Sequence, residues 1–280
     1  MDYELIIGDC IKSMQSMPEK SVQTCVTSPP YFGLRDYGND QQIGLEQTPE
    51  EFVNKLVEVF REVRRVLKDD GTLWLNLGDS YGDKQLFGIP WRVAFALQAD
   101  GWYLRQDIIW SKPNPMPESV KDRCTKSHEY IFLLSKSPKY YYDNEAIKED
   151  AKDWGTRDRS DGKYHNEGSG LQPHTGLEKS YDKKNKRSVW EVTPKPYSGA
   201  HFAVYPPELI EPCILAATKK GDTVLDPFGG SGTTAGVALK HKRKAILCEL
   251  NPEYASIVDD RIKDIFPDIN QYNLLDILED

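Results

Sequence analysis

The stretch Val224-Leu225-Asp226-Pro227-Phe228-Gly229-Gly230-Ser231-Gly232-Thr233-Thr234 decides the fold of this 280-residue chain. Residues 223–225 predict a short buried strand, the glycines predict a tight turn, and residues 232–240 predict a helix that follows directly. Glycines allow a backbone to approach a ligand closely, and the start of a helix presents free N–H groups. The stretch lacks the lysine of a GxxxxGK[ST] phosphate loop, so ATP binding is disfavoured.

An acidic residue stands in register with this turn. Residues 245–248 predict the next strand, and Glu249 follows it, about 20 residues after the glycines. An acid at this place commonly accepts hydrogen bonds from a ribose. The alternative is a tight structural turn with an exposed glutamate, but strand, helix and acid in register favour a nucleoside-binding site.

Strand and helix patterns alternate along the rest of the chain. Thr48, Pro49 and Glu51 form the signature of a helix start, and the apolar stripe that follows runs to a stop at Gly71. We expect further helices at 91–98, 207–219 and 252–265, and strands at 5–7, 21–27, 72–77, 103–110 and 129–134. This alternation predicts an α/β fold with a mostly parallel twisted sheet and helices on both faces.

One long segment interrupts the alternation. Residues 152–187 contain no Val, Ile, Phe, Met or Ala, so they cannot bury a core of their own and predict a surface loop that is mobile without a partner. Residues 112–187 hold 16 Lys and Arg against 13 Asp and Glu, whereas the whole chain has a formal net charge of −8. A locally basic face can bind phosphates on an acidic protein. Its candidate phosphate-binding residues are Lys183, Lys184, Lys186 and Arg187, here named the cation cluster.

The turn Ser28-Pro29-Pro30-Tyr31 closes the second expected strand. The Ser28 hydroxyl and the Pro29 carbonyl can accept hydrogen bonds from an aromatic amino group, draw its nitrogen toward tetrahedral geometry and hold it in line with an electrophile. Pro30 stiffens the turn, and Tyr31 offers a ring on which a base can stack. For these four residues alone, an ordinary Pro-Pro turn is the alternative.

Together, the two turns resemble the amino-group DNA methyltransferases with permuted motif order, the beta group. In that family the catalytic tetrapeptide comes first, the recognition region follows and the cofactor loop comes last, which is the order found here. The resemblance extends to Gly8-Asp9-Cys10, to residues 201–209 and to Asn251-Pro252-Glu253-Tyr254. Residues 110–117 with His128-Glu129 resemble the family's segment beside the target base. It implies a Rossmann-like methyltransferase fold over residues 1–280 as a single catalytic domain, with residues 112–190 as an inserted DNA-recognition region.

The resemblance also assigns roles to residues. It implies S-adenosyl-L-methionine as the cofactor, with Glu249 on the ribose and Asp9 near the adenine. The residues expected to bind this cofactor are Asp9, Cys10, Thr27, His201, Tyr205, Asp226, Pro227, Phe228, Gly229, Gly230, Ser231, Gly232, Thr233, Glu249 and Leu250. The residues expected to be catalytic are Ser28, Pro29, Pro30 and Tyr31.

The target base follows from the tetrapeptide. Many adenine enzymes of this family have Asp where this chain has Ser28, and the serine version is typical of enzymes that make 4-methylcytosine. We therefore expect methylation of N4 of a flipped cytosine in double-stranded DNA, with N6 of adenine as the alternative. More distant alternatives are a DNA-binding module on an inactive methyltransferase fold, a dinucleotide-dependent oxidoreductase, and an RNA or protein methyltransferase.

The remaining observations concern partners and location. Cys213 lies in a helix-like run rather than after a strand, so a carbon-5 cytosine methyltransferase with a cysteine nucleophile is disfavoured. The histidines and cysteines show no metal-ligand spacing, and we expect no metal. No stretch approaches a membrane span and no signal-peptide pattern begins the chain, so we expect a cytoplasmic protein of a bacterium, archaeon or phage. A cognate restriction endonuclease and a homodimer are the expected protein partners.

Overall fold

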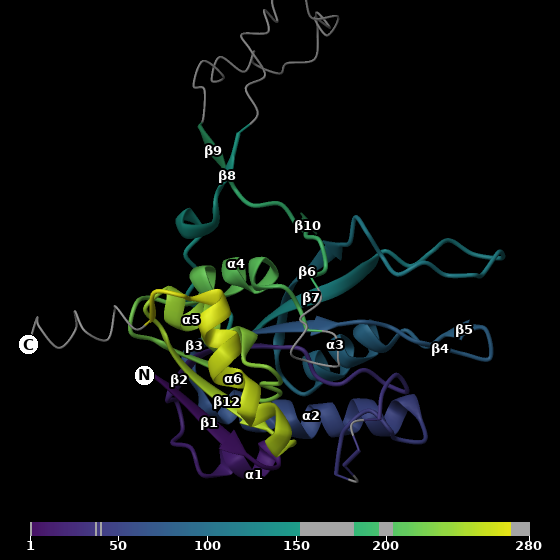
Figure 1. The fold of residues 1–280 in the computed structure, drawn as a ribbon, viewed down its shortest axis with the longest axis horizontal. Coiled ribbons are helices and arrows are strands. Elements are labelled where there is room, and N and C mark those ends of the chain that lie inside the picture. The colour runs from purple at the N-terminus through teal and green to yellow at the C-terminus, as the bar shows by residue number, and fades with distance from the viewer. Residues whose placement is uncertain (1, 37, 40, 152–181, 196–203, 270–280) are drawn as a thin grey trace, which may run out of the picture.

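The structure is a computed structural model that describes residues 2–36, 38–39, 41–151, 182–195 and 204–269 (Figure 1). In these residues one eight-stranded sheet forms the centre of the molecule. Its strands, in spatial order, are β1 (Tyr3–Ile7), β12 (Lys244–Glu249), β11 (Thr223–Asp226), β2 (Val22–Thr27), β3 (Leu67–Leu77), β7 (His128–Ser135), β6 (Tyr103–Ser111) and β10 (Val189–Glu191). In this described sheet only β7 runs antiparallel to its neighbours, β3 and β6; the other pairs are parallel.

Helices cover both faces of this sheet. The period of two along β3 divides the core, because Leu73 and Leu75 pack with one set of helices and Trp74 with the other. The first set is α1 (Cys10–Gln15), α2 (Pro49–Val66) and α3 (Ile89–Ala99). The second set is α4 (Pro207–Ala217), α5 (Thr233–Lys240) and α6 (Pro252–Ile265). The predicted α/β fold, mostly parallel and covered on both faces, is therefore confirmed.

Local sequence signals predict the start of helix α2 correctly but not its end. Its start is as predicted: the Thr48 hydroxyl accepts from the Glu51 N–H at 3.2 Å, and the Glu51 carboxylate accepts from the Thr48 N–H at 3.1 Å. Its end is not at Gly71, because the backbone becomes extended at Leu67 and β3 begins there. Leu67 is fully buried and pairs with Val22 of β2, so burial in the sheet overrides the helical pattern.

Smaller elements extend from the sheet. Strands β4 (Tyr81–Gly82) and β5 (Gln85–Leu86) form a hairpin, and a short 3₁₀ helix spans Glu145–Ile147. Strand β8 (Glu149–Asp150) pairs antiparallel with β9 (Lys183–Lys184), so within the loop expected over 152–187 residues 183–184 form a short strand instead. The reason is charge pairing, since Asp150 and Glu149 lie against the cation cluster. Residues 152–181 of that expected loop lie outside the described residues.

Candidate active site

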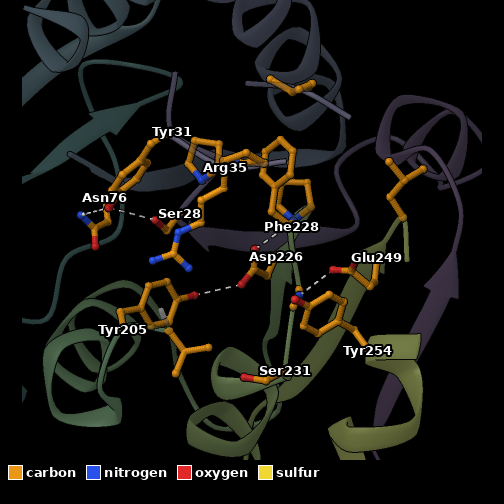
Figure 2. A pocket seen from close by; sticks show the side chains of 18 of the residues that line it. Ser28, Tyr31, Arg35, Asn76, Tyr205, Asp226, Phe228, Ser231, Glu249 and Tyr254 are labelled. Atoms are coloured by element: carbon orange, nitrogen blue, oxygen red, sulfur yellow. Dashed lines mark hydrogen bonds between the residues drawn. The ribbon is translucent and has the colours of Figure 1, made fainter. Parts of the chain in front are cut away.

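A cavity of about 420 Å³ opens at the carboxyl ends of the parallel strands. The turns after β1, β2, β11 and β12 line it, together with the end of β3. Figure 2 shows Asn76, Ser28 and Tyr31 gathered on one side and Glu249 and Tyr254 on the other. In an open parallel sheet this edge is where ligands bind, and the volume lies in the range of small-molecule sites.

Two glycines of the turn after β11, Gly229 and Gly232, have no room for a side chain. A Cβ on Gly229 would lie 2.8 Å from the Leu247 Cβ, and a Cβ on Gly232 would lie 2.8 Å from Val258 Cγ1. Gly230 has φ +51° and Gly232 has φ +89°, which is backbone that favours glycine. A Cβ on Gly230 would meet only the Phe228 carbonyl oxygen within 4 Å, so this residue faces open space. The turn therefore presents bare backbone to the cavity.

The buried carboxylate of Asp226 stabilises the glycine turn through hydrogen bonds. Asp226 is 1% exposed, and its carboxylate accepts from the Thr27 hydroxyl at 2.6 Å, the Tyr205 hydroxyl at 2.9 Å and the Phe228 N–H at 3.1 Å. Burial raises the pKa of Asp226, and burial also raises the pKa of Tyr205 well above its usual range. Tyr205 is therefore a neutral donor at physiological pH.

Two predicted cofactor residues support the cavity wall rather than line it. Thr27 is buried and bonded to Asp226, and Gly232 lies behind the turn as the N-cap of α5. His201 lies outside the described residues. The other predicted residues line the cavity: Asp9, Cys10, Tyr205, Asp226, Pro227, Phe228, Gly229, Gly230, Ser231, Thr233, Glu249 and Leu250.

Glu249 links β12 to the glycine turn. Its carboxylate accepts from the Gly230 N–H and from the Asn251 N–H, both at 2.8 Å. Burial raises the pKa of Glu249, and the two N–H donors oppose that rise. Glu249 is therefore held in place by backbone donors while it lines the cavity.

The turn after β1 supplies Asp9 and Cys10 to the cavity. Asp9 caps α1 by accepting from the Lys12 N–H at 3.0 Å. Burial raises the pKa of the Cys10 thiol to about 12, so this thiol is not a nucleophile at neutral pH.

The predicted tetrapeptide begins a directed chain of hydrogen bonds. The Ser28 hydroxyl donates to the Tyr31 oxygen at 3.4 Å, and the Tyr31 hydroxyl donates to Glu129 Oε2 at 2.7 Å. A carboxylate oxygen only accepts, so the order of donors runs from Ser28 through Tyr31 to Glu129. The lone pairs of the Ser28 oxygen are therefore left to accept from a further donor.

Asn76, at the end of β3, is a residue that sequence reasoning missed. Its Nδ2 donates to Glu129 Oε2 at 3.1 Å, to the Tyr130 carbonyl at 3.3 Å and to the Tyr31 oxygen at 3.4 Å. The carboxylate and the carbonyl only accept, which fixes the orientation of the amide. Its Oδ1 has no partner among the described residues, although Asn76 is 3% exposed. A polar residue within an otherwise apolar buried strand was the available signal.

Lys112, in the segment that the resemblance places beside the target base, lines the cavity, as does Arg35, which was not predicted. Lys112 forms an ion pair with Glu129, and its Nζ lies 4.2 Å from the centre of the Trp110 ring. Arg35 extends from the segment after the Ser28–Tyr31 turn toward Ser28 and Tyr205 (Figure 2). No local pattern marks Arg35, because only the path of the chain brings it to the cavity.

The cation cluster lies elsewhere. Lys184, Lys186 and Arg187 have nitrogens 3.7, 3.9 and 3.3 Å from Glu149, and Lys183 pairs with Asp150. None of the four is among the described residues that line the cavity. Within the part of the chain that the structure describes, no three metal-ligating side chains come together. The helices in those residues are all too short or too polar to span a bilayer.

The chemistry available in this cavity combines two halves. Bare backbone and buried acids on one side suit a nucleoside-like ligand, and Ser28 and Asn76 on the other side offer hydrogen-bond acceptors to an amino group. Burial raises the pKa of the cavity-lining Cys248 to about 12, so this thiol, like Cys10, stays protonated at neutral pH.

Comparison with known proteins gives consistent matches. A family model described as DNA methylase (N6_N4_Mtase) matches residues 22–260. The chain is 48% identical to the type II methyltransferase M.Cfr9I of Citrobacter freundii, over 92% of this chain and 87% of the relative. It is 46% identical to M.SmaI of Serratia marcescens, over 92% of this chain and 90% of the relative.

Solved structures share the fold. The cytosine-N4-specific PvuII DNA methyltransferase superposes with a TM-score of 0.70 at 23% identity, covering 96% of this chain and 93% of that one. The Thermus thermophilus protein TTHA0409, solved in complex with S-adenosyl-L-methionine, superposes with a TM-score of 0.65 at 27% identity, covering 95% of this chain and 96% of that one.

Proposed function

Because the chain belongs to the family of DNA methylases that modify exocyclic amino groups, we propose that it methylates N4 of a cytosine flipped out of double-stranded DNA. The methyl donor of this family is S-adenosyl-L-methionine. When bound, this cofactor supplies an electrophilic methyl group on its sulfonium. The observation that carries the proposal is the cavity in which the glycine turn meets the acceptors Ser28 and Asn76.

The residues present fit the cofactor. Gly229 and Gly230 would hold it against bare backbone, and Ser231 contributes a buried hydroxyl that has no partner in the described residues. Glu249 would accept from ribose hydroxyls, and Asp9 would lie near the adenine. An unpaired buried hydroxyl costs about 1–3 kcal/mol, so a ligand that pairs with Ser231 recovers that free energy.

The other half of the cavity would hold the target base. The amino nitrogen is a poor nucleophile because its lone pair is delocalised into the ring. Ser28 Oγ, the Pro29 carbonyl and Asn76 Oδ1 are acceptors for its two hydrogens, and holding them draws the nitrogen toward tetrahedral geometry. Tyr31 would stack on the base, which contributes about 1–3 kcal/mol.

The hydrogen-bond chain also offers a route for the proton that the amino nitrogen must release. The cofactor would supply its methyl group to the amino nitrogen as its S–CH₃ bond breaks, and that nitrogen would then have to lose one proton. Ser28 and Tyr31 offer a path from this nitrogen to the Glu129 carboxylate, since each hydroxyl can accept a proton and pass on its own. Direct transfer, with no covalent intermediate on the enzyme, is part of the proposal, because burial raises the pKa of the cavity-lining thiols Cys10 and Cys248 and so disfavours their nucleophilic thiolates.

Cytosine is proposed over adenine on the serine of the tetrapeptide. The experiment is incubation of unmethylated double-stranded DNA with the cofactor, followed by mass spectrometry of the digested nucleosides. We expect 4-methyldeoxycytidine. Finding 6-methyldeoxyadenosine alone contradicts the cytosine assignment, and DNA binding without any methylated nucleoside supports the non-catalytic alternative.

The remaining partners are part of the same proposal. Residues 112–190 would form the DNA-recognition region, with the cation cluster on phosphates. The type II relatives support a cognate restriction endonuclease that cleaves the same sequence when it is unmethylated. DNA modified by this chain should resist that nuclease. Light scattering of the purified chain tests the proposed homodimer.

A further inference from the structure

Met116 is the most exposed large apolar side chain among the described residues, at 85%. It also lines the cavity at the sheet edge. Single exposed apolar side chains are common on protein surfaces, so the exposure alone has no consequence. Its location is informative, because a side chain that lines the cavity and is still 85% exposed lies at the rim of that cavity.

The backbone that carries Met116 is stiff. It lies in Pro113-Asn114-Pro115-Met116-Pro117, where three prolines fix φ and remove backbone N–H donors. Proline-rich segments of this kind favour extended conformations without internal hydrogen bonds. The Met116 side chain is therefore carried by backbone whose φ is restricted at Pro115 and Pro117 on either side of it.

The connection from β6 to β7, which contains this segment, is braced at several points. The Lys112 N–H donates to the Ser127 carbonyl at 2.8 Å and closes the base of the connection. The Glu118 carboxylate accepts from Arg123 at 2.6 Å and from the Lys126 N–H at 3.2 Å. These contacts hold the tip in one arrangement.

The β6–β7 connection also contacts the β4–β5 hairpin. The Arg123 guanidinium lies 4.1 Å from the centre of the Tyr81 ring, in the β4–β5 hairpin. Figure 1 shows the hairpin and the β6–β7 connection extending on the same side of the molecule. Lys121, an exposed cation of the connection, suits a phosphate of a duplex lying against these arms.

We propose that Met116 enters the duplex and fills the space left in the stack by the flipped base. The inference rests on the proposed function, since it presupposes a base flipped from double-stranded DNA. Flipping requires unstacking and unpairing of the base, and apolar side chains such as methionine are known wedges between bases. A stiff, braced and exposed methionine at the cavity rim has the chemistry and the position for this role.

The test compares Met116→Ala with Val120→Ala, once the recognition sequence has been mapped. Val120 is a matched control because it is 41% exposed on the same connection but does not line the cavity. Each variant methylates a paired duplex and a duplex with an abasic site opposite the target base. On the paired duplex Met116→Ala should lower kcat/KM about tenfold or more, and on the abasic duplex it should act within about twofold of wild type, because the pairing that resists flipping is absent. Val120→Ala should match wild type on both.

Fluorescence of pyrrolocytosine, a cytosine analogue that still pairs with guanine, at the target position gives a second readout. Met116→Ala should reduce the increase in fluorescence that accompanies flipping, while Met116→Leu should retain most of it. If Met116→Ala lowers kcat/KM equally on both duplexes, or on neither, the proposed wedge role of Met116 is wrong. A wild-type chain that methylates neither duplex overturns the proposed function instead, and the fluorescence then still decides the wedge, because flipping requires DNA binding but not methyl transfer.

Discussion

Gly78→Ala tests whether the position of the Tyr31 ring controls methyl transfer. Gly78 follows β3, and a Cβ there would lie 2.5 Å from Tyr31 Cε2 and 3.0 Å from Cδ2. Non-bonded carbons prefer about 3.5–4.0 Å, so the ring must retreat by about 1 Å. The backbone of Gly78 is outside the left-handed region, so alanine itself introduces no strain there.

The displaced Tyr31 ring cannot keep its hydroxyl hydrogen-bonded to both Ser28 and Glu129. The Tyr31 hydroxyl is held at 2.7 Å from Glu129, so a shift of about 1 Å disturbs the hydrogen-bond chain from Ser28. Misplacement of this size costs a reaction about a hundredfold, and overpacking costs the fold about 1–3 kcal/mol. We expect kcat to fall about a hundredfold with the dissociation constant of the cofactor unchanged, because the glycine turn is on the other side of the cavity.

Single-turnover methyl transfer and calorimetry of cofactor binding measure the two quantities. The control is the pair Tyr31→Ala and Gly78→Ala/Tyr31→Ala. If Gly78→Ala acts through the ring, the double variant should be no slower than Tyr31→Ala alone. A kcat for Gly78→Ala within about threefold of wild type, or effects that multiply in the double variant, refutes the reasoning.

Three further predictions concern the cofactor and DNA. Burial raises the pKa of Glu249, and ribose hydroxyls would donate to its ionised form, so cofactor affinity should rise as pH increases through that raised pKa. In calorimetry, Glu249→Gln should bind the cofactor more weakly and lose this pH dependence. An affinity that varies with pH as in wild type contradicts the assignment. Gly230→Val places a branched side chain at φ +51°, facing the cavity, and should abolish cofactor binding while circular dichroism still shows a folded chain; unchanged affinity excludes the turn from the site. Replacing the cation cluster with glutamines should weaken DNA binding but leave cofactor affinity unchanged. The slope of log K for DNA against log salt should become smaller in magnitude by about 0.9 for each phosphate that the cluster neutralises. A slope equal to that of wild type excludes the cluster from the interface.

Local features of the chain could be predicted without the structure. The capping box at Thr48 and the strand, turn and helix around Gly230 involve residues within a few positions of one another. Their geometry follows from backbone preferences that the sequence states directly. The order of the two turns along the chain likewise predicted the family, which the family model and the relatives confirm.

Interactions between distant residues could not be predicted in this way. Tyr31 and Glu129 are 98 positions apart, and Asn76 and Glu129 are 53 apart, yet all three meet at one edge of the sheet. The helix expected to run to Gly71 ends at Val66 because Leu67 is buried against β2. Strand order, register and burial decide these features, and they depend on the packing of the whole sheet rather than on any window of sequence.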